Sequence, residues 1–150
     1  MEASSMYPPQ YQAQPQLQYV GVGVRFLALL IDSLILGAVN GILVALFPPS
    51  PGAVGLVGPG LAGLIGGIIA IVYTFGLEAT QGATLGKRVL GLRVVKTDGS
   101  PIGWSESIIR NLLRIVDALF GYLVGAILIW TSPQRQRLGD RVANTVVVRR

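Results

Sequence analysis

The chain of 150 residues contains no cysteine and no histidine, and charged residues make up only 13 % of it. Without cysteine there are no disulfides, thiolate nucleophiles or cysteine-based metal sites. Without histidine the commonest metal ligand and the usual general base are missing. The hydrophobic fraction of 51 % and the mean hydropathy of +0.61 exclude a disordered chain, a coiled coil and an ordinary soluble enzyme. We therefore expect a membrane protein with no metal site, no cofactor and no catalytic activity.

The first nineteen residues differ from the rest of the chain. Residues 1–19 are rich in proline and glutamine and poor in aliphatic side chains. Such a segment buries too little apolar surface to offset the entropy of ordering, so we predict a disordered tail. Residues 20–150 are expected to form one membrane domain.

Two long apolar runs predict transmembrane helices at about residues 26–47 and 54–77. Asp32 is the only charged residue of the first run, and the second run has none. At 1.5 Å per residue, the runs would extend about 33 and 36 Å, which is enough to cross the hydrocarbon core of a bilayer. The residues between them, rich in proline, predict a short turn.

Two short polar segments predict a small sheet. The segment 78–103 is expected to be a cytoplasmic loop, within which residues 92–97 alternate as a strand does and precede an Asp-Gly turn signal. Residues 144–149 predict a second strand. Pairing of the two would add a small cytoplasmic β cap to an otherwise all-α membrane protein.

Residues 104–130 leave two interpretations open. In the first half, Arg110, Arg114 and Asp117 share one helical face. The second half is uncharged but, at about 20 Å of helix, too short to span a bilayer alone. The stretch is either one tilted third crossing or an interfacial helix followed by a re-entrant one. A basic segment, residues 131–150, follows it.

Basic residues set the expected orientation. The segment 78–111 contains five Lys or Arg, whereas the turn at residues 48–53 has no charge. The positive-inside rule therefore places this segment and the N-terminus in the cytoplasm. The basic segment 131–150 favours the cytoplasm too, although three crossings would place it outside. We predict a cytoplasmic C-terminus.

Two acids are candidates for an ion or proton site. Asp32 lies in an apolar run, where a carboxylate costs about 2.5–3.5 kcal/mol. Arg25 precedes it by two helical turns, about 10 Å, so each is expected to have a partner elsewhere. A buried Asp32 marks an ion or proton path or, equally, a structural hydrogen bond or ion pair. Asp117 either pairs with Arg114 in its own helix or faces Asp32, where two carboxylates would hold a proton or small cation.

Small residues four positions apart predict close helix contacts or self-association. They are Ser33, Gly37, Gly41, Gly63, Gly67, Gly121 and Gly125. Basic residues outside the apolar runs are predicted to bind anionic lipid headgroups, because no aromatic-interleaved basic face favours nucleic acid. They are Lys87, Arg88, Arg93, Arg135 and Arg137.

The order of several motifs resembles the RDD family of small bacterial membrane proteins, named for an arginine and two aspartates. The resemblance covers residues 20–148. Residues 25–32 (RFLALLID) resemble the family's opening, with arginine at the start of the first helix and aspartate within it. The other matching segments are residues 82–88 with 91–95, residues 109–114, and residues 136–140 with 145–148.

The resemblance implies that Arg25 and Asp32 are family residues and that Asp140 is the second aspartate, with Asp117 as the competing assignment. Asp140 could instead form only a structural salt bridge with its neighbour Arg137. The resemblance implies transport, and cation/proton antiport has been suggested for some members. Because so few crossings do not enclose a pore, transport would require a homo-oligomer. The alternative is a non-transporting scaffold or accessory subunit whose Arg and Asp residues are structural.

Overall fold

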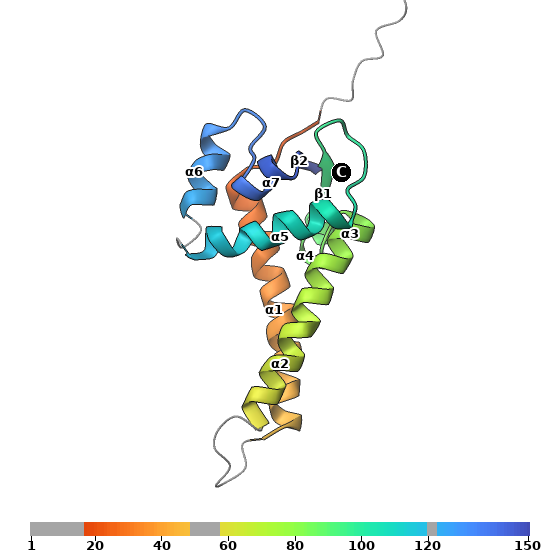
Figure 1. Ribbon diagram of the computed structural model, residues 1–150, viewed down its shortest axis with the longest axis vertical. Helices are drawn as coiled ribbons and strands as arrows, with labels where there is room; N and C mark the ends of the chain where they lie inside the picture. Colours follow the sequence, from red (N-terminus) through yellow and green to blue (C-terminus); the bar gives the residue numbers. More distant parts are fainter. Residues whose placement is uncertain (1–16, 49–57, 120–122) are drawn as a thin grey trace, which may run out of the picture.

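The computed structural model describes residues 17–48, 58–119 and 123–150 (Figure 1). The elements are α1 (Val22–Leu46), α2 (Gly58–Ile71), a π-helical turn η1 (Val72–Gly76), α3 (Leu77–Gln81), α4 (Leu85–Val89), β1 (Leu92–Lys96), α5 (Trp104–Leu119), α6 (Leu123–Thr131), α7 (Leu138–Val142) and β2 (Thr145–Arg149). Helix α1 and the continuous helix α2–η1–α3 lie side by side, and we call them the hairpin. Residues 17–21 and the described residues after residue 81 gather at one end of the hairpin and form the cap.

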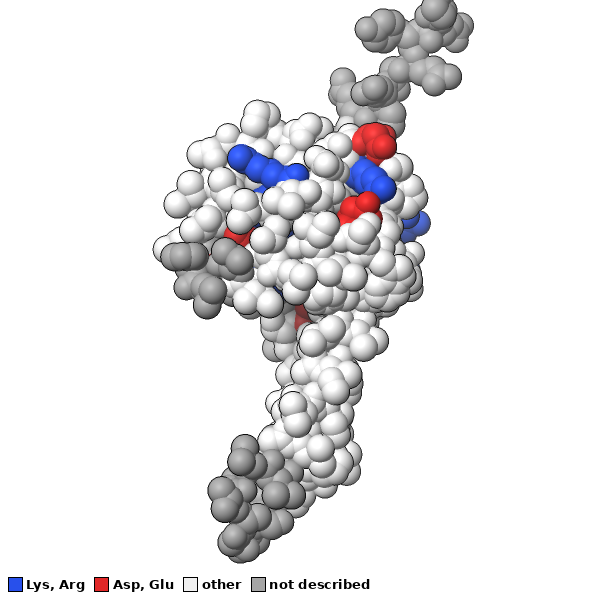
Figure 2. All heavy atoms as spheres, in the orientation of Figure 1, with Lys and Arg blue, Asp and Glu red and all other residues white. Residues whose placement is uncertain are grey.

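The hairpin has the length and composition of two membrane-spanning helices. Apolar windows with mean hydropathies of 2.2 and 2.0 lie in Val22–Leu46 and Gly60–Gln81. Its large apolar side chains point outward, so that Leu34 and Leu64 are 75 % and 68 % exposed. Figure 2 shows charged side chains on the cap and a hairpin below it that is white over most of its length. Such extensive apolar exposure is unfavourable in water and is what a lipid-facing surface requires.

The second hairpin helix continues beyond the apolar run that predicts it. In its π-helical turn, the carbonyl of Phe75 accepts a hydrogen bond from the Ser107 hydroxyl at 2.9 Å. The helix ends at Gly82, whose φ of 69° is in the left-handed region that favours glycine. Glu78, which we expected in a loop, therefore lies in the last helical turn. The first helix likewise begins at Val22, four residues before its predicted start.

The two predicted strands pair, as expected, into an antiparallel ladder with Val94 opposite Val147. The chain before α1 runs along the other edge of β2, where the Val20 N–H donates to the Val147 carbonyl at 3.0 Å. Tyr19 bridges to Val148 in the same way. The predicted tail of residues 1–19 is therefore too long by residues 17–19, because β2 offers them backbone partners. Residues 1–16 lie outside the described residues.

One face of this sheet packs against the start of α1. Their shared core contains Val20, Ala28, Leu92, Val94, Ile102 and Val147. The beginning of the described chain, the loop after α3 and the C-terminal strand consequently lie at the same end of the molecule (Figure 1). This arrangement agrees with the charge of the basic C-terminal segment and removes the conflict that a third plain crossing would create.

Residues 104–130 form two helices that run in different directions (Figure 1), so one continuous tilted crossing is wrong. Helix α5 runs across the hairpin instead of alongside it. Its polar residues Ser107, Arg110 and Asn111 are buried, whereas Ile115 on the same helix is 59 % exposed. The buried polar face holds α5 against the end of the hairpin, because Ser107 donates to the Phe75 carbonyl and Arg110 donates to Glu78. Re-entry of α6 into the bilayer stays a prediction.

Candidate functional site

Ion pairs join the hairpin to the cap. Asp140, on α7, lies between two arginines from other elements. Arg25 Nη1, on α1, is 2.7 Å from Asp140 Oδ2, and Arg110 Nη1, on α5, is 2.6 Å from Asp140 Oδ1. The backbone N–H of Arg137 also donates to Asp140 Oδ2 at 3.1 Å, at the start of α7. Asp140 thus fixes three helices to one another.

The same network continues through Arg110 toward the end of the hairpin. Arg110 Nε donates to Glu78 Oε1 at 2.6 Å, and Lys87 Nζ lies 2.6 Å from Glu78 Oε2. Arg110 Nη1 also donates to the Thr145 hydroxyl at 2.6 Å, which adds β2 to the network. We call Arg25, Asp140, Arg110, Glu78 and Lys87 the charge network.

The charge network is removed from water. The side chains of Arg110, Glu78 and Asp140 are at most 2 % exposed. Burial alone would raise the pKa of Asp140, but Arg110 and the other nearby arginines outweigh this effect and hold that pKa well below its usual range. Burial lowers the pKa of Lys87 to about 8, although the Glu78 carboxylate opposes the change. Asp140 therefore remains ionised and paired at any pH near neutrality.

Arg25 needs the geometry of a guanidinium to make all of its contacts. Besides Asp140, it donates from Nε to the Val20 carbonyl at 3.1 Å and from Nη2 to the Arg135 carbonyl at 2.6 Å. A lysine has one nitrogen and could not reach three acceptors in these directions. As expected, Arg25 does not pair with Asp32, and each has partners elsewhere.

Asp32 is buried and accepts three hydrogen bonds. The donors are the Tyr73 hydroxyl at 2.6 Å, the Thr84 hydroxyl at 2.6 Å and the Gly86 N–H at 2.8 Å. Among the described residues, no Lys or Arg nitrogen lies within 4.0 Å of its carboxylate. The arrangement resembles an N-cap supplied from another helix, because Asp32 holds the first turn of α4 against α1.

Two glycines permit these close approaches. A Cβ on Gly86 would overlap the carbonyl oxygen of Ala28 and lie 2.9 Å from the Asp32 carboxylate. A Cβ on Gly139 would lie 2.9 Å from the carbonyl oxygen of Arg110. Each glycine therefore allows a short cap helix to contact a longer helix at backbone distance.

Asp117 has neither of the two arrangements predicted for it. Its carboxylate lies against Gly125 of α6, whose added Cβ would be 3.1 Å from Asp117 Cγ. Among the described residues, Asp117 makes no ion pair with Arg114, and its buried Oδ1 has no hydrogen-bond partner. Burial raises the pKa of Asp117. The second acid that the structure joins to Arg25 is Asp140, and not Asp117.

The five predicted headgroup ligands have different surroundings. Lys87 is a correction, because it is paired with Glu78 and its side chain is only 13 % exposed. Arg88 donates to Gln81 at the surface. The remaining three are Arg93 and Arg135, both exposed, and Arg137, which is half-buried. Headgroup binding by these exposed and half-buried arginines stays a prediction.

The predicted small-residue contacts do not form within the described chain. Gly37, Gly41, Gly63 and Gly67 would each have a Cβ with no neighbouring atom within 4 Å, and Ser33 is exposed. The close contact between α1 and α2 instead uses Gly66, whose Cβ would lie 2.7 Å from Asn40 Oδ1. Gly125 contacts Asp117, and Gly121 lies outside the described residues. Contact between copies of the chain stays a prediction for the four open glycines.

Sequence reasoning missed several partners in this site. Glu78 is the first charge after a long uncharged run, and that abrupt change is a signal that could have identified it. Arg110 belongs to a segment with family resemblance but was not assigned a role. Tyr73 and Thr84 have no local signal, because they meet Asp32 only when the hairpin closes.

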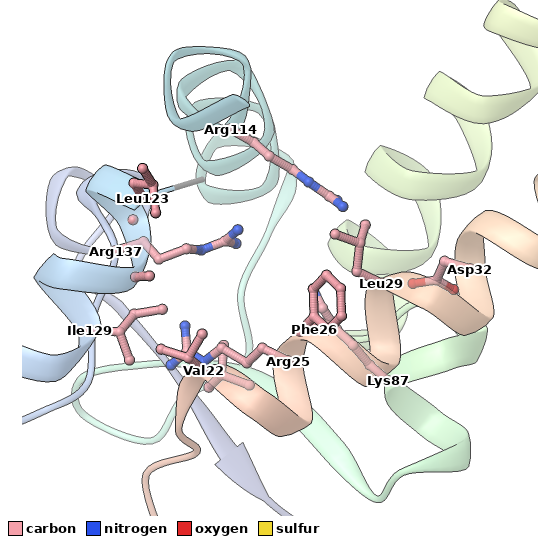
Figure 3. Close-up of a pocket in the computed structure, with 13 residues that line it drawn as sticks. Val22, Arg25, Phe26, Leu29, Asp32, Lys87, Arg114, Leu123, Ile129 and Arg137 are labelled. Atoms are coloured by element: carbon pink, nitrogen blue, oxygen red, sulfur yellow. The ribbon is translucent and has the colours of Figure 1, made fainter. Parts of the chain in front are cut away.

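A cavity of about 280 Å³ lies beside the charge network, between α1, α5 and α6 (Figure 3). Arg114 and Arg137 reach toward it from the cap, while Phe26 and Leu29 line it from α1. The acids of the site are not arranged as metal ligands. Within the described parts of the chain no three acids cluster, and both network carboxylates are already bridged by cations.

Comparison with known proteins supports the resemblance. The model of the RDD family matches residues 19–144. The chain is 30 % identical to an uncharacterized membrane protein of Bacillus subtilis over 156 residues, which cover 99 % of this chain and 92 % of the relative. It is also 35 % identical over 86 residues to a proline-rich antigen homolog of Mycobacterium tuberculosis, and 32 % identical over 78 residues to the proline-rich antigen of Mycobacterium leprae.

The two mycobacterial matches are partial. They cover 56 % and 51 % of this chain, and the chain spans only 35 % and 31 % of the lengths of those relatives. No solved structure matches. The match over residues 19–144, together with the near full-length similarity to a membrane protein, shows that the chain belongs to the RDD family of membrane proteins.

Proposed function

We propose that this RDD protein is a non-transporting scaffold or accessory subunit of the bacterial inner membrane. The observation that supports this function best is the saturation of its two family aspartates. Asp32 accepts three hydrogen bonds from the chain itself, and Asp140 is bridged by two arginines. A carboxylate that carries ions must exchange its ligands, whereas removing a donor from a buried carboxylate costs about 1–3 kcal/mol. The acids act by holding the cap on the hairpin.

In this proposal the hairpin crosses the bilayer and returns, with the N-terminus and the cap in the cytoplasm. All 12 Lys and Arg lie outside residues 26–86, so the positive charge is at the cap end. The positive-inside rule then favours a cytoplasmic cap. The test uses the lack of cysteine, because one engineered cysteine is then a unique label site. Thr97→Cys and Arg150→Cys should resist an impermeant thiol reagent in intact cells, whereas Ser50→Cys should react.

A scaffold of this kind acts together with other chains, and a second copy is one partner that the surface suits. The four open glycines Gly37, Gly41, Gly63 and Gly67 leave space on the hairpin for another helix to approach closely. No catalytic step belongs to this proposal. Labelling of Thr97→Cys from outside the cell would contradict the proposed orientation.

Transport is the second candidate, and one observation favours it. Asp32 lines two cavities, one bounded by Arg137 and α6 and the other by Asn111 and Thr74. A small cation or a proton passing from one cavity to the other would meet this carboxylate. In that case Asp32 exchanges protons as part of a homo-oligomeric cation/proton antiporter.

Sealed vesicles containing purified protein distinguish the two candidates. With a pH gradient and added sodium or potassium, a scaffold should move protons no faster than protein-free vesicles do. Asp32→Asn should then reduce the amount of folded protein, and its proton flux should equal that of protein-free vesicles, as for the natural chain. The control Ser33→Ala should leave the amount of folded protein unchanged. Cation-dependent proton flux that Asp32→Asn abolishes in folded protein would overturn the scaffold and establish the antiporter.

A further inference from the structure

The cavity between α1, α5 and α6 combines strong positive charge with an apolar wall. We propose that it binds the phosphate headgroup of an anionic phospholipid, with Arg114 and Arg137 as the phosphate ligands. This proposal goes beyond the scaffold function, because it assigns a ligand and a site that neither candidate function requires.

The cationic side chains of the cavity outnumber its acids. Four cations line it, namely Arg25, Lys87, Arg114 and Arg137, against the single carboxylate of Asp32. Two of the cations already have carboxylate partners in the charge network. Asp32 lies at the edge of the cavity in Figure 3 and is occupied by its three donors. The remaining positive charge belongs to Arg114 and Arg137.

Neither of these two arginines forms an ion pair in the described part of the chain. Within the described residues, no carboxylate oxygen lies within 4.0 Å of a guanidinium nitrogen of Arg114 or Arg137. Arg137 Nε is buried and has no hydrogen-bond partner among them. A buried unpaired donor is costly unless a ligand satisfies it. Phosphate is suited to this role, because its oxygens accept from two guanidinium groups at once.

The apolar wall favours a lipid over a free phosphate ion. Val22, Phe26 and Leu29 of α1 face Leu123 and Ile129 of α6 across the cavity (Figure 3). Phe26 is 55 % and Leu123 is 67 % exposed, so the apolar wall continues onto the outer surface. An inorganic anion would leave this surface unused, whereas an acyl chain would cover it.

The position of the cavity also suits a membrane lipid. Its α1 lining, from Val22 to Asp32, belongs to the half of that helix nearest the cap, which is the level of the headgroups if the hairpin spans the bilayer. A volume of about 280 Å³ is close to the lower size of small-molecule sites. It suits a phosphodiester and the first part of one chain, while the rest of the lipid lies along the hairpin. Basic pockets beside transmembrane helices bind anionic headgroups in this manner.

A substitution of Asp117 provides a test in which lipid binding should become stronger instead of weaker. It is the acid whose charge acts on both Arg114 and Arg137 without contacting either. If the cavity binds an anion, Asp117 competes with it electrostatically. Asp117→Asn should therefore bind the lipid more tightly, whereas Arg114→Gln and Arg137→Gln should bind it more weakly.

The experiment measures lipid binding by the purified full chain in a neutral detergent, using native mass spectrometry and lipid titration. We expect phosphatidylglycerol to bind at least tenfold more tightly than phosphatidylcholine. The double variant Arg114→Gln/Arg137→Gln should lose this preference. Its matched control, Arg141→Gln/Arg149→Gln, removes the same charge from exposed positions outside the cavity and should retain it. Ala126→Phe should fill the cavity without changing any charge and also abolish the preference.

Each outcome decides the proposal. Equal binding of the two lipids, equal loss in the control pair, or full binding by Ala126→Phe would overturn it. If inorganic phosphate displaces phosphatidylglycerol at equal concentration, the cavity binds a soluble anion, and the proposal that a lipid occupies it is overturned. Should the double variant fail to fold, Ala126→Phe and Asp117→Asn still decide. Without lipid, Arg137→Gln should unfold at the same temperature as the natural chain. A lower unfolding temperature would mean that Arg137 stabilises the fold instead of binding a ligand, and would overturn the proposal.

Discussion

Where the cap meets the hairpin, five largely buried charged side chains are joined by ion pairs of 2.6–2.7 Å. Farther along the hairpin, Asn40 lies against the backbone of Gly66, and most apolar side chains face outward. The cap end thus has directional contacts that determine one arrangement. The rest of the hairpin has few such contacts, and it relies on a surrounding apolar phase to make its exposed surface favourable. The difference predicts that the two regions respond oppositely to polar and steric substitutions.

The largest expected effect comes from removing the cation at the centre of the charge network. Arg110→Met should reduce the free energy of unfolding by about 3–5 kcal/mol, because Glu78 and Asp140 would each lose a buried partner. Unfolding is measured by tryptophan fluorescence in detergent, since Trp104 and Trp130 both lie in the cap. The exposed Arg141→Met should change little. A loss below about 1 kcal/mol would mean that the network does not stabilise the cap.

The next effect is steric and compares two glycines. Gly86→Ala should destabilise by about 1–3 kcal/mol, because its Cβ would overlap the carbonyl oxygen of Ala28 in a packed contact. Gly67→Ala in the hairpin adds a Cβ with no atom of the described chain within 4 Å, so it should be neutral or slightly stabilising. Thermal unfolding of the two variants measures the contrast. Equal transition temperatures would show that α4 does not approach α1 as closely as the structure indicates.

Acid should weaken the cap before the hairpin. The pKa of Asp140 lies below its unfolded value of about 3.8 in the folded cap. Below about pH 4 the unfolded state therefore binds more protons, so the free energy of unfolding falls as the pH falls toward the folded pKa. Tryptophan fluorescence should show the cap loosening between pH 5 and about pH 2, while far-UV circular dichroism retains the hairpin helices. Asp140→Asn should remove part of this pH dependence, and unchanged dependence would count against the pairing.

The smallest effect on stability is expected at the open glycines of the hairpin. Gly37→Leu and Gly67→Leu should each change the free energy of unfolding by less than about 0.5 kcal/mol, because no atom of the described residues lies within 4 Å of a Cβ added at either position. Self-association should nevertheless weaken if these glycines face a second copy. Sedimentation equilibrium in detergent measures the oligomeric state of the natural chain and of each variant. Unchanged association would remove these glycines from any interface between copies.

The same comparison explains what could be predicted. Apolar runs and alternating strands are local signals, and both hairpin helices and both strands follow from them to within a few residues. The one exception with a local cause is Glu78, which the change from uncharged to polar sequence placed in a loop although it lies in the last helical turn. Arg25 and Asp32 stood out because charges at the ends or interior of apolar runs are costly. Their partners did not, because Asp140 is 115 residues from Arg25 and Thr84 is 52 from Asp32.

The amino-acid sequence by itself determined the apolar hairpin, the strand pair, the position of the positive charge and the family, since each depends on composition or on neighbours along the chain. Only the tertiary structure decided which acid Arg25 pairs with, that Lys87 turns inward to Glu78, and that Arg114 and Arg137 meet at one cavity. The physical reason is that a buried charge is satisfied by whichever opposite charge the packing brings within about 3 Å. That distance depends on how separate helices contact one another, and not on spacing along the chain.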